Sequence, residues 1–387
     1  MAEPWAPSAS LCGLLPSPAC VAPSAVTPTV ANTWWERAPT MPLVRDRDAR
    51  GRRFLANCSA CAAHPGLKPC SRSVERQEAF VMALVEVLMP VPRPGFFIEV
   101  GAHNGMHQSN TMFAHGCKSW RGLLIEANPS AFEQLTARRV GNVVTWRTAL
   151  CANHTTVHFV SRQGRRDDAK ADEMGGVETV LDPLAYRATL TRQKLLPRST
   201  NGSHPWLDAP KGVFHRYPVP CSPLGSMLRL LRATRVDVFW LDVEGSELPA
   251  LQGFDFDAVS VGVLVVETRA NDAHRNRAVR SLLRTNGFEV VRSLPVWGGR
   301  IYDTVYVRLE HFWGSGARDG TDVRWASLQS LLAQPLSYRC VKARCAKRAP
   351  VFMTYGPGRL GAGRPYVVRG LKEECVAAPH DGHERLC

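Results

Sequence analysis

The sequence predicts an α/β protein with a doubly wound, mostly parallel sheet, and two observations carry this prediction. Short apolar runs typical of buried strands alternate with segments of helical periodicity. Several of these runs end in glycines or carboxylates, and the carboxyl ends of strands are where open α/β sheets place their ligands. The chain has 387 residues, 45% hydrophobic and 21% charged, so we expect a globular protein with one large domain and appendages.

The predicted elements can be placed along the chain from their periodicity and terminal residues. The expected strands are residues 96–100, 122–126, 142–150, 155–160, 238–241, 261–267, 288–294 and 301–309. The expected helices are residues 73–89, a segment ending near 115, a segment beginning at 129, residues 224–232, the segment after 245, and residues 271–286. Ser73 would cap the first helix and Pro90 would end it, Asn128 would cap the helix at 129, and Gly287 would stop the last. The last two strands alternate like an antiparallel terminal pair.

This pattern indicates one globular domain with an extension at each end. We expect the domain over residues 71–312, interrupted at residues 161–220 by a long insertion where periodicity is lost and Arg, Asp, Gly and Pro are frequent. Residues 1–70 are expected to be a largely disordered extension, because the first forty are rich in Pro, Ala, Ser and Thr and lack a convincing signal peptide. Residues 313–387 are a basic, cysteine-containing extension with little predicted structure.

The formal net charge of +14 favours acidic partners. We expect an anionic partner to bind the basic C-terminal extension, and compositional drift toward arginine is the alternative. The sequence has no RNA-reading aromatic motif and no finger spacing, so no nucleic-acid partner is expected. It also has no apolar run long enough to cross a bilayer, so no transmembrane segment is expected.

The 12 cysteines of the chain lie largely before and after the predicted sheet. This placement predicts disulfides that tie down the termini in an oxidising compartment. The alternative is a zinc site built from Cys58, Cys61 and Cys70 with a fourth ligand from elsewhere. The asparagines in N-glycosylation sequons are Asn57, Asn153 and Asn201. Both features favour the secretory pathway, as a Golgi or secreted protein, and a cytoplasmic location is the alternative.

The first candidate site is a glycine-containing loop after the strand that carries Glu99. Gly101 and Gly105 would let the backbone approach a ligand and would open a helix whose amides face it. A dinucleotide fold would need a third glycine in the spacing GxGxxG to hold a pyrophosphate. Here three residues separate the two glycines and there is no third, so the loop suits a nucleoside cofactor without phosphates.

The second candidate is Glu126, which ends the next strand. A carboxylate at this position can accept hydrogen bonds from both ribose hydroxyls of a nucleoside cofactor. The alternative is a carboxylate that caps the helix beginning at Asn128. Taken together with the glycine loop, Glu126 predicts a nucleoside site.

The third candidate is the segment VDVFWLDVEGSELPALQG at residues 236–253. Its apolar run leads directly into three carboxylates, Asp242, Glu244 and Glu247, grouped around Gly245. Unpaired buried carboxylates are costly, so buried strands seldom end in so much negative charge without cause. The segment therefore indicates an active or binding site.

With these motifs the chain resembles the FkbM family of S-adenosylmethionine-dependent methyltransferases. The matching stretches, in family order, are FIEVGAHNGMHQSNTMF, GLLIEANP, VPCSPLGSML, VDVFWLDVEGSELPALQGF, VGVLVVET and DTVYV. The terminal hairpin resembles the class I methyltransferase arrangement, a Rossmann-like sheet whose seventh strand inserts antiparallel beside the fifth. The triplet Ser109-Asn110-Thr111 after the glycine loop resembles the eukaryotic branch that includes Star-like proteins.

The resemblance implies methyl transfer from S-adenosyl-L-methionine to an oxygen of a glycan or small hydroxylated acceptor. The alternative is a non-catalytic, Star-like binding or trafficking protein that keeps the fold. The residues implied in cofactor binding are Glu99, Gly101, Ala102, Gly105, Glu126 and Asn128. The catalytic residues would be Asp242, as base or acceptor-orienting group, with Glu244 and His103. Glu247 would serve its helix, and Glu267 lies in the right layer to contact the acceptor. No metal ligand is predicted, and a divalent cation held by Asp242 and Glu244 is the alternative.

Overall fold

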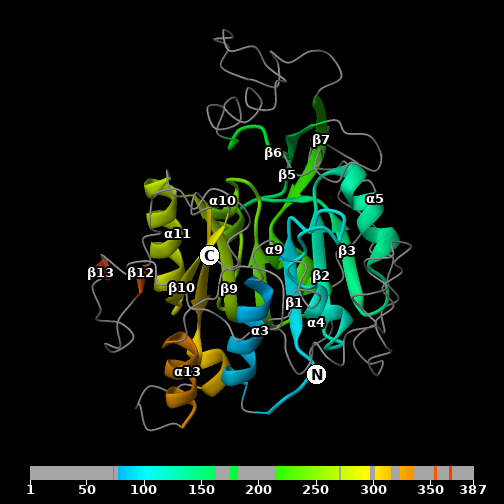
Figure 1. Cartoon of the computed structure of the whole chain (residues 1–387). Coiled ribbons are helices and arrows are strands. Elements are labelled where there is room, and N and C mark those ends of the chain that lie inside the picture. Colours follow the sequence, from blue (N-terminus) through cyan, green and yellow to red (C-terminus); the bar gives the residue numbers. More distant parts are fainter. Residues whose placement is uncertain are drawn as a thin grey trace, which may run out of the picture.

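The protein, represented by a computed structural model, has a central sheet with helices on both faces (Figure 1). The structure describes residues 73, 77–89, 91–162, 175–181, 214–269, 272–296, 301–314 and 323–333, together with 353–354 and 366–367. The extension expected at residues 1–70 lies outside this part of the chain, as does the alternative zinc site at Cys58, Cys61 and Cys70.

Seven strands form the central sheet, in the order β10-β11-β9-β8-β1-β2-β3. Their bounds are β1 Phe96–Val100, β2 Arg121–Glu126, β3 Val143–Arg147, β8 Arg235–Leu241, β9 Ser260–Arg269, β10 Glu289–Val296 and β11 Ile301–Val307. The neighbours from β3 across to β9 run parallel, whereas β11 is antiparallel to both β9 and β10. The predicted doubly wound sheet with an antiparallel terminal hairpin is confirmed, and it is the Rossmann-like arrangement of class I methyltransferases.

The central strands are buried on both faces, which explains why their sequences are continuous apolar runs. All of β1 is buried, and so is β8 beyond its first residue. The helices that cover one face are α3 (Gln77–Leu88), α4 (Met112–Gly116), α5 (Pro129–Arg138), α12 (Leu309–Trp313) and α13 (Val323–Ala333). The helices that cover the other are α9 (Leu224–Leu230), α10 (Glu247–Gln252) and α11 (Ala273–Thr285). The two cores make a three-layer α/β/α domain.

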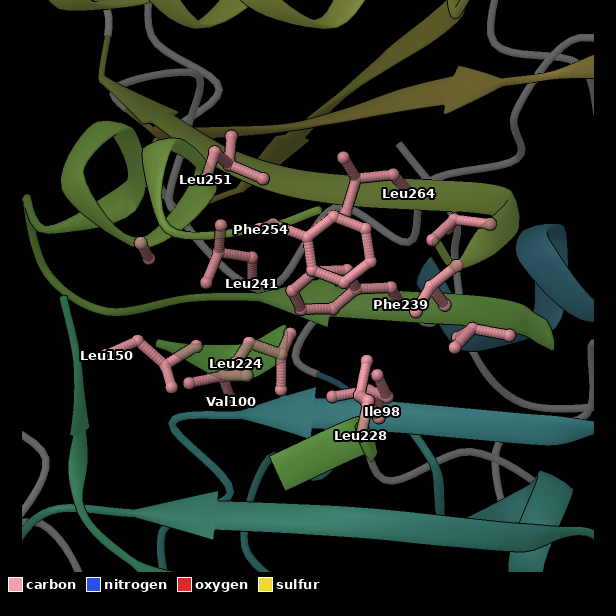
Figure 2. Close-up of a cluster of buried hydrophobic side chains, with 14 of the residues drawn as sticks. Ile98, Val100, Leu150, Leu224, Leu228, Phe239, Leu241, Leu251, Phe254 and Leu264 are labelled. Carbon is pink, nitrogen blue, oxygen red and sulfur yellow. The ribbon is translucent and has the colours of Figure 1, made fainter. Parts of the chain in front are cut away.

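The core under α9 and α10 fixes the end of β8 that carries the acidic segment. Phe239 of β8 packs against Phe254 with 6.0 Å between ring centroids. Leu251 of α10 and Leu264 of β9 lie beside this aromatic pair (Figure 2). Burial of each such side chain contributes on the order of 2–3 kcal/mol. The turn between β8 and α10 is therefore anchored on both sides by packed apolar residues.

A second sheet of four strands adjoins the end of β3, at the top of the molecule in Figure 1. Its order is β4-β7-β5-β6, with β4 Ala149–Leu150, β5 Thr155–Arg162, β6 Gly175–Val177 and β7 Phe214–Ser222. The expectation of one continuous strand at residues 142–150 is therefore wrong. The chain breaks at Thr148, whose hydroxyl donates to the carbonyls of Ala149 and Pro220, both at 2.9 Å. These bonds direct the chain from the central sheet into the second one.

The insertion predicted at residues 161–220 contains regular structure that the sequence pattern did not reveal. β7 pairs antiparallel with β5 along its whole length, and β6 pairs with the other edge of β5. Few β7 side chains are buried, and the strand contains Pro218 and Pro220, which usually argue against a strand. Residues 163–174 and 182–213 of the insertion lie outside the described part of the chain.

The predicted helix ends are correct to within a few residues. Asn128 caps α5 as expected, because its side chain accepts hydrogen bonds from the amides of Ser130 and Ala131. Gly287 follows α11 with a φ of 80°, the left-handed conformation expected of a glycine stop. The described part of the first helix is α3, Gln77–Leu88, and residues 74–76 lie outside the described residues. The Ser73 hydroxyl accepts from the amide of Glu78 at 3.2 Å.

Part of the C-terminal extension belongs to the domain. α13 packs beside α3, and its Leu328 is buried in the same core. Two short strands, β12 (Met353–Thr354) and β13 (Tyr366–Val367), pair with each other farther along the chain. Residues 323–333 thus differ from the expectation of little structure after residue 312. Among the described residues, no helix combines the length and apolar character needed to cross a membrane.

Asp237 is a buried carboxylate near the start of β8, at the end of the strand opposite to Asp242. It accepts hydrogen bonds from Arg93 at 2.6 and 3.1 Å, from the amide of Phe96 at 2.9 Å and from His311 at 3.1 Å. Burial alone would raise the pKa of Asp237, but the bonds from His311, Arg93 and Phe96 outweigh it and lower the pKa to about 2. The carboxylate therefore ties α12 and the entry of β1 to β8.

We expect Asp237→Asn to lower stability in a pH-dependent way. Because the folded pKa of about 2 lies below the ordinary 3.8, the ionised group stabilises the fold above pH 3.8 and loses this contribution as the pH falls toward 2. The shift corresponds to about 2 kcal/mol. Urea unfolding across this pH range should show a flatter pH dependence for the variant than for the wild type. Asp257→Asn, at an exposed site, is the matched control. Parallel curves for Asp237→Asn and the wild type would refute the assignment.

Candidate active site

A cavity of about 170 Å³ opens where β1, β2, β8 and β9 end. The predicted site residues that line it are Glu99, Gly101, Ala102, His103, Glu126, Asp242 and Glu244. Gly105 and Asn128 are not among its lining residues. Gly105 lies over Arg139 and Leu135, and Asn128 caps α5. The fold thus brings the three sequence motifs to one cavity, as open α/β sheets do at their carboxyl edge.

The glycine loop is fitted tightly between β2 and β8. The amides of Gly101 and Ala102 both donate to the carbonyl of Ile125 at 3.0 Å. Gly101 has a φ of +79°, and a Cβ built on it would lie 1.9 Å from the backbone oxygen of Asp242. Only glycine allows this conformation and this close approach. The loop backbone is therefore brought against the first residue of the acidic segment.

Glu99 lines the cavity and also holds the glycine loop in place through hydrogen bonds. Its carboxylate accepts from the Ser109 hydroxyl at 3.0 Å, from the amide of Asn110 at 2.7 Å and from the Thr111 hydroxyl. Burial raises the pKa of Glu99, and the charge of Arg139 and these hydrogen bonds oppose that rise. Its main contacts are with the chain itself, so the structure shows Glu99 chiefly as a residue that shapes the loop.

Arg139, just after α5, is fully buried beneath the same loop. Its guanidinium donates to the Gly105 carbonyl at 3.0 Å, to the Ser109 hydroxyl at 3.1 Å and to the Thr111 hydroxyl at 3.1 Å. Burial lowers the pKa of Arg139 to about 10, against the opposing pull of Glu99. Sequence reasoning missed this residue, since an arginine at a helix end is usually solvated. The Glu99–Arg139 pair fixes the loop from both sides.

Glu126 is held firmly at the cavity wall. One carboxylate oxygen accepts from the amide of His103 at 2.7 Å, and the other accepts from the amide of Asn128 at 2.7 Å. The bond to Asn128 matches the alternative of a carboxylate that serves the following helix. The two interpretations are compatible, because the same carboxylate lines the cavity. Its backbone bonds orient it at the edge where a ribose would lie.

The opposite wall of the cavity comes from segments that the sequence did not single out. Thr148, Ala149 and Leu150 line it at the junction between the two sheets, and residues 175–177 of β6 line it from the insertion. Gly176 lies close to Glu244, because a Cβ built on it would be 3.4 Å from that residue's Cβ. The second sheet therefore closes the cavity over the acidic segment.

The acidic segment turns sharply after β8. Glu244 has a φ of +54° and Gly245 a φ of +113°, so two consecutive residues adopt left-handed or near left-handed backbone. Glu247 stabilises this turn by accepting from the amide of Gly245 at 3.0 Å, and Arg275 lies 3.3 Å from its other oxygen. The expectation that Glu247 serves its helix and not the acceptor agrees with this geometry.

Asp242 and Glu244 share the cavity with two further carboxylates, Glu267 and Asp303, which face each other across β9 and β11. Asp242 is exposed to the cavity, and no donor among the described residues hydrogen-bonds its carboxylate. Desolvation inside the cavity, then the charges of Glu244 and Asp303, raise the pKa of Asp242 well above its usual range. Burial likewise raises the pKa of Asp303 to about 7. Asp303 was not predicted as a site residue.

Arg269 is the cation nearest to these carboxylates among the described residues. It pairs with Glu244, and its Nε lies 4.0 Å from Glu267. Carboxylate oxygens of Asp242, Glu244 and Glu267 also lie within 4.8 Å of one another, a spacing that can hold a divalent cation with oxygen ligands at about 2.3–2.6 Å. The guanidinium is close enough to Glu244 that such an ion would compete with it.

His103 lies at the rim of the glycine loop with a φ of +48° and lines the cavity. Its ring meets the ring of His107 edge-on, with 6.1 Å between centroids. The backbone amide of His103 donates a hydrogen bond to the Glu126 carboxylate. This hydrogen bond gives His103 a structural role in the loop. Its catalytic role stays a prediction.

Residues 99–290 match the model of the methyltransferase FkbM domain, so this part of the chain is an S-adenosyl-L-methionine-dependent methyltransferase domain of that type. A methyltransferase FkbM from Methylobacillus flagellatus is similar at 12% identity and a TM-score of 0.30, over 67% of this chain and 59% of that one. An O-methyltransferase from Bacillus cereus in complex with SAH is similar at 11% identity and a TM-score of 0.29, over 68% and 91%. A TehB-like methyltransferase from Corynebacterium glutamicum shows 10% identity and a TM-score of 0.29, over 67% and 98%. No curated protein matches the chain.

The cavity fits S-adenosyl-L-methionine, the cofactor of this domain. Gly101 brings the loop backbone against Asp242 at the cavity wall, and the glycine loop lacks the third glycine of a pyrophosphate site, as suits a cofactor without phosphates. Glu126 presents a fixed carboxylate for ribose hydroxyls.

Proposed function

We propose that the domain is an active methyltransferase that methylates a hydroxyl oxygen of a glycan or another small hydroxylated acceptor. The observation that supports this proposal is the position of the Asp242 carboxylate, in the same cavity as Gly101 and Glu126 and without a hydrogen-bond donor among the described residues. A carboxylate in this state is ready to accept a hydrogen bond from an incoming hydroxyl.

The cofactor supplies an electrophilic methyl group when it is bound. Asp242 would accept the acceptor hydroxyl's proton, and its raised pKa makes the ionised carboxylate a stronger base than an ordinary aspartate. Glu267 and Asp303 would accept further hydroxyls, which suits a polyhydroxylated molecule. Glu244, held by Arg269, would keep the turn and the acceptor side in place.

The proposal is tested with the full chain in two steps. Isothermal titration with S-adenosyl-L-methionine should show binding, and incubation with radiolabelled cofactor and a panel of glycans and small alcohols should label at least one acceptor. Ester formation on carboxyl compounds or labelling of amines alone would contradict O-methylation. Cofactor binding without turnover on any tested acceptor, including compounds extracted from cells, would favour the non-catalytic, Star-like alternative.

Glu126→Ala should weaken cofactor binding on the order of 10²- to 10⁴-fold, because hydrogen bonds to a charged group contribute about 1.5–3 kcal/mol each and two ribose hydroxyls would lose their acceptor. Titration calorimetry measures this affinity. Glu126→Gln is the matched control, since it keeps one acceptor oxygen and should lose less. An unchanged affinity in a folded Glu126→Ala variant would remove Glu126 from the cofactor site.

A further inference from the structure

The bend between β4 and β5 exposes an N-glycosylation sequon. It consists of Asn153, His154 and Thr155, and all three residues are exposed. The Asn153 side chain makes no hydrogen bond to any described residue. It is also absent from the cavity lining, so a large substituent there would not block the candidate active site. The sequon is thus accessible and lies outside the cavity lining.

Neighbouring contacts hold this bend in place. The ring of His154 lies 3.2 Å from the Ser222 hydroxyl and 3.1 Å from the Ser226 hydroxyl. On the other side, the backbone at Cys151 packs against Gly253, where a Cβ would come within 2.4 Å of the Cys151 carbonyl oxygen. Because His154 is anchored to β7 and α9, the preceding Asn153 stays at the surface.

The cysteines indicate the compartment in which the chain matures. Cys151 and Cys221 form a disulfide with 5.5 Å between their Cα atoms, and Cys117 is disulfide-bonded as well. These are all the cysteines within the described part of the chain. Stable disulfides are rare in the cytosol and common in the secretory pathway, which is also where asparagine is glycosylated. Two independent features of one segment, the sequon and the disulfide, therefore favour the same compartment.

We infer that Asn153 carries an N-linked glycan, added in the oxidising compartment where the Cys151–Cys221 disulfide forms. In this reaction the amide nitrogen of Asn153 displaces the lipid diphosphate from the anomeric carbon of a lipid-linked oligosaccharide. A C–N bond forms, the C–O bond to the diphosphate breaks, and the amide proton leaves to a base of the transferring enzyme. The donor is a lipid-diphosphate oligosaccharide.

The order of synthesis favours this modification. Cys221 lies 70 residues after Cys151, so chain elongation separates their appearance by roughly 3.5 to 14 s. During that interval the sequon is available as an unfolded acceptor, before the disulfide and the β5–β7 pairing close the segment. The glycan would then remain on the finished surface.

The test uses the full chain made in animal cells and purified under conditions that block free thiols. Peptide N-glycosidase in heavy-oxygen water, followed by mass spectrometry, should convert Asn153 to labelled aspartate. Asn153→Gln and Thr155→Ala should both lose this label and one glycan in mass, whereas Thr155→Ser keeps a sequon and should retain it. Digestion without reductant should yield a linked peptide pair containing Cys151 and Cys221.

Each contrary result has a defined meaning. An unmodified Asn153 in folded, disulfide-linked protein would overturn the assignment of this site. This holds even when Asn57 or Asn201 carries a glycan. Unmodified asparagine together with free thiols at Cys151 and Cys221 would overturn both the site and the compartment. None of these outcomes depends on methyl transfer, so the inference is independent of the proposed function.

Discussion

Replacement of Asp242 by asparagine is expected to lower methyl transfer by about 10²- to 10⁴-fold, the usual contribution of a general base. Asparagine keeps the size of the side chain but cannot accept a proton. Cofactor affinity should change little, because the contacts assigned to the cofactor lie on Gly101 and Glu126. Single-turnover labelling with a saturating acceptor measures the rate, and titration calorimetry measures the affinity. The expected signature is thus a loss in rate constant with intact binding.

Asp303→Asn is the matched control for this experiment. It removes one carboxylate from the same cavity, yet Asp303 lies on β11 and is hydrogen-bonded to Gln77. We expect it to slow the reaction less than tenfold, within about 1.4 kcal/mol of the wild-type barrier. Equal losses in both variants would show that net charge, and not a base at position 242, controls the rate.

A chelator separates two roles of Asp242. If Asp242 acts as a base beside the Arg269–Glu244 pair, activity should be unchanged after treatment with EDTA. If Asp242, Glu244 and Glu267 hold a divalent cation, EDTA should abolish activity and Mg²⁺, Mn²⁺ or Ca²⁺ should restore it. Loss of activity in EDTA would therefore show that Asp242 acts as a metal ligand and not as the base.

The residues that the sequence predicted well are those whose role is set locally. Gly101 and Glu126 stand directly at strand ends, and parallel strands bring their carboxyl ends together whatever the rest of the chain does. Asn128 and Gly287 were likewise identifiable, because capping depends on a few neighbouring backbone groups. Local chemistry therefore predicted which of these residues line the cavity and which end a helix.

The residues that were missed owe their role to distant contacts. Arg139 becomes buried only because Glu99 and the glycine loop fold over it. Asp303 meets Glu267 through the register of an antiparallel strand, and a shift of one residue would turn it to the other face. Gly176 reaches the cavity from β6, in an insertion whose longest strand, β7, buries few side chains and so lacks a clear periodicity. The acceptor side of the cavity therefore needed the structure.

Gly101→Ala is expected to destabilise the fold by about 3 kcal/mol or more and to abolish detectable cofactor binding, from strain and a steric clash. The alanine Cβ would lie 1.9 Å from the Asp242 carbonyl oxygen, in backbone with a φ of +79°. That oxygen cannot easily move, because the Asp242 amide is bonded to Val100 and the Gly101 amide to Ile125. Urea unfolding and titration calorimetry measure the two effects.

Gly225→Ala provides the control for the same substitution in a different setting. Gly225 lies in α9, and the nearest atom to its added Cβ would be Arg229 Nη1 at 3.6 Å, an ordinary contact. Alanine there should stabilise the helix by about 0.5–1 kcal/mol and leave cofactor binding unchanged. The two variants should thus move stability in opposite directions, because only Gly101 is held against the backbone of the acidic segment. If Gly101→Ala matched Gly225→Ala in stability and affinity, the close contact between the glycine loop and Asp242 would not be part of the folded protein.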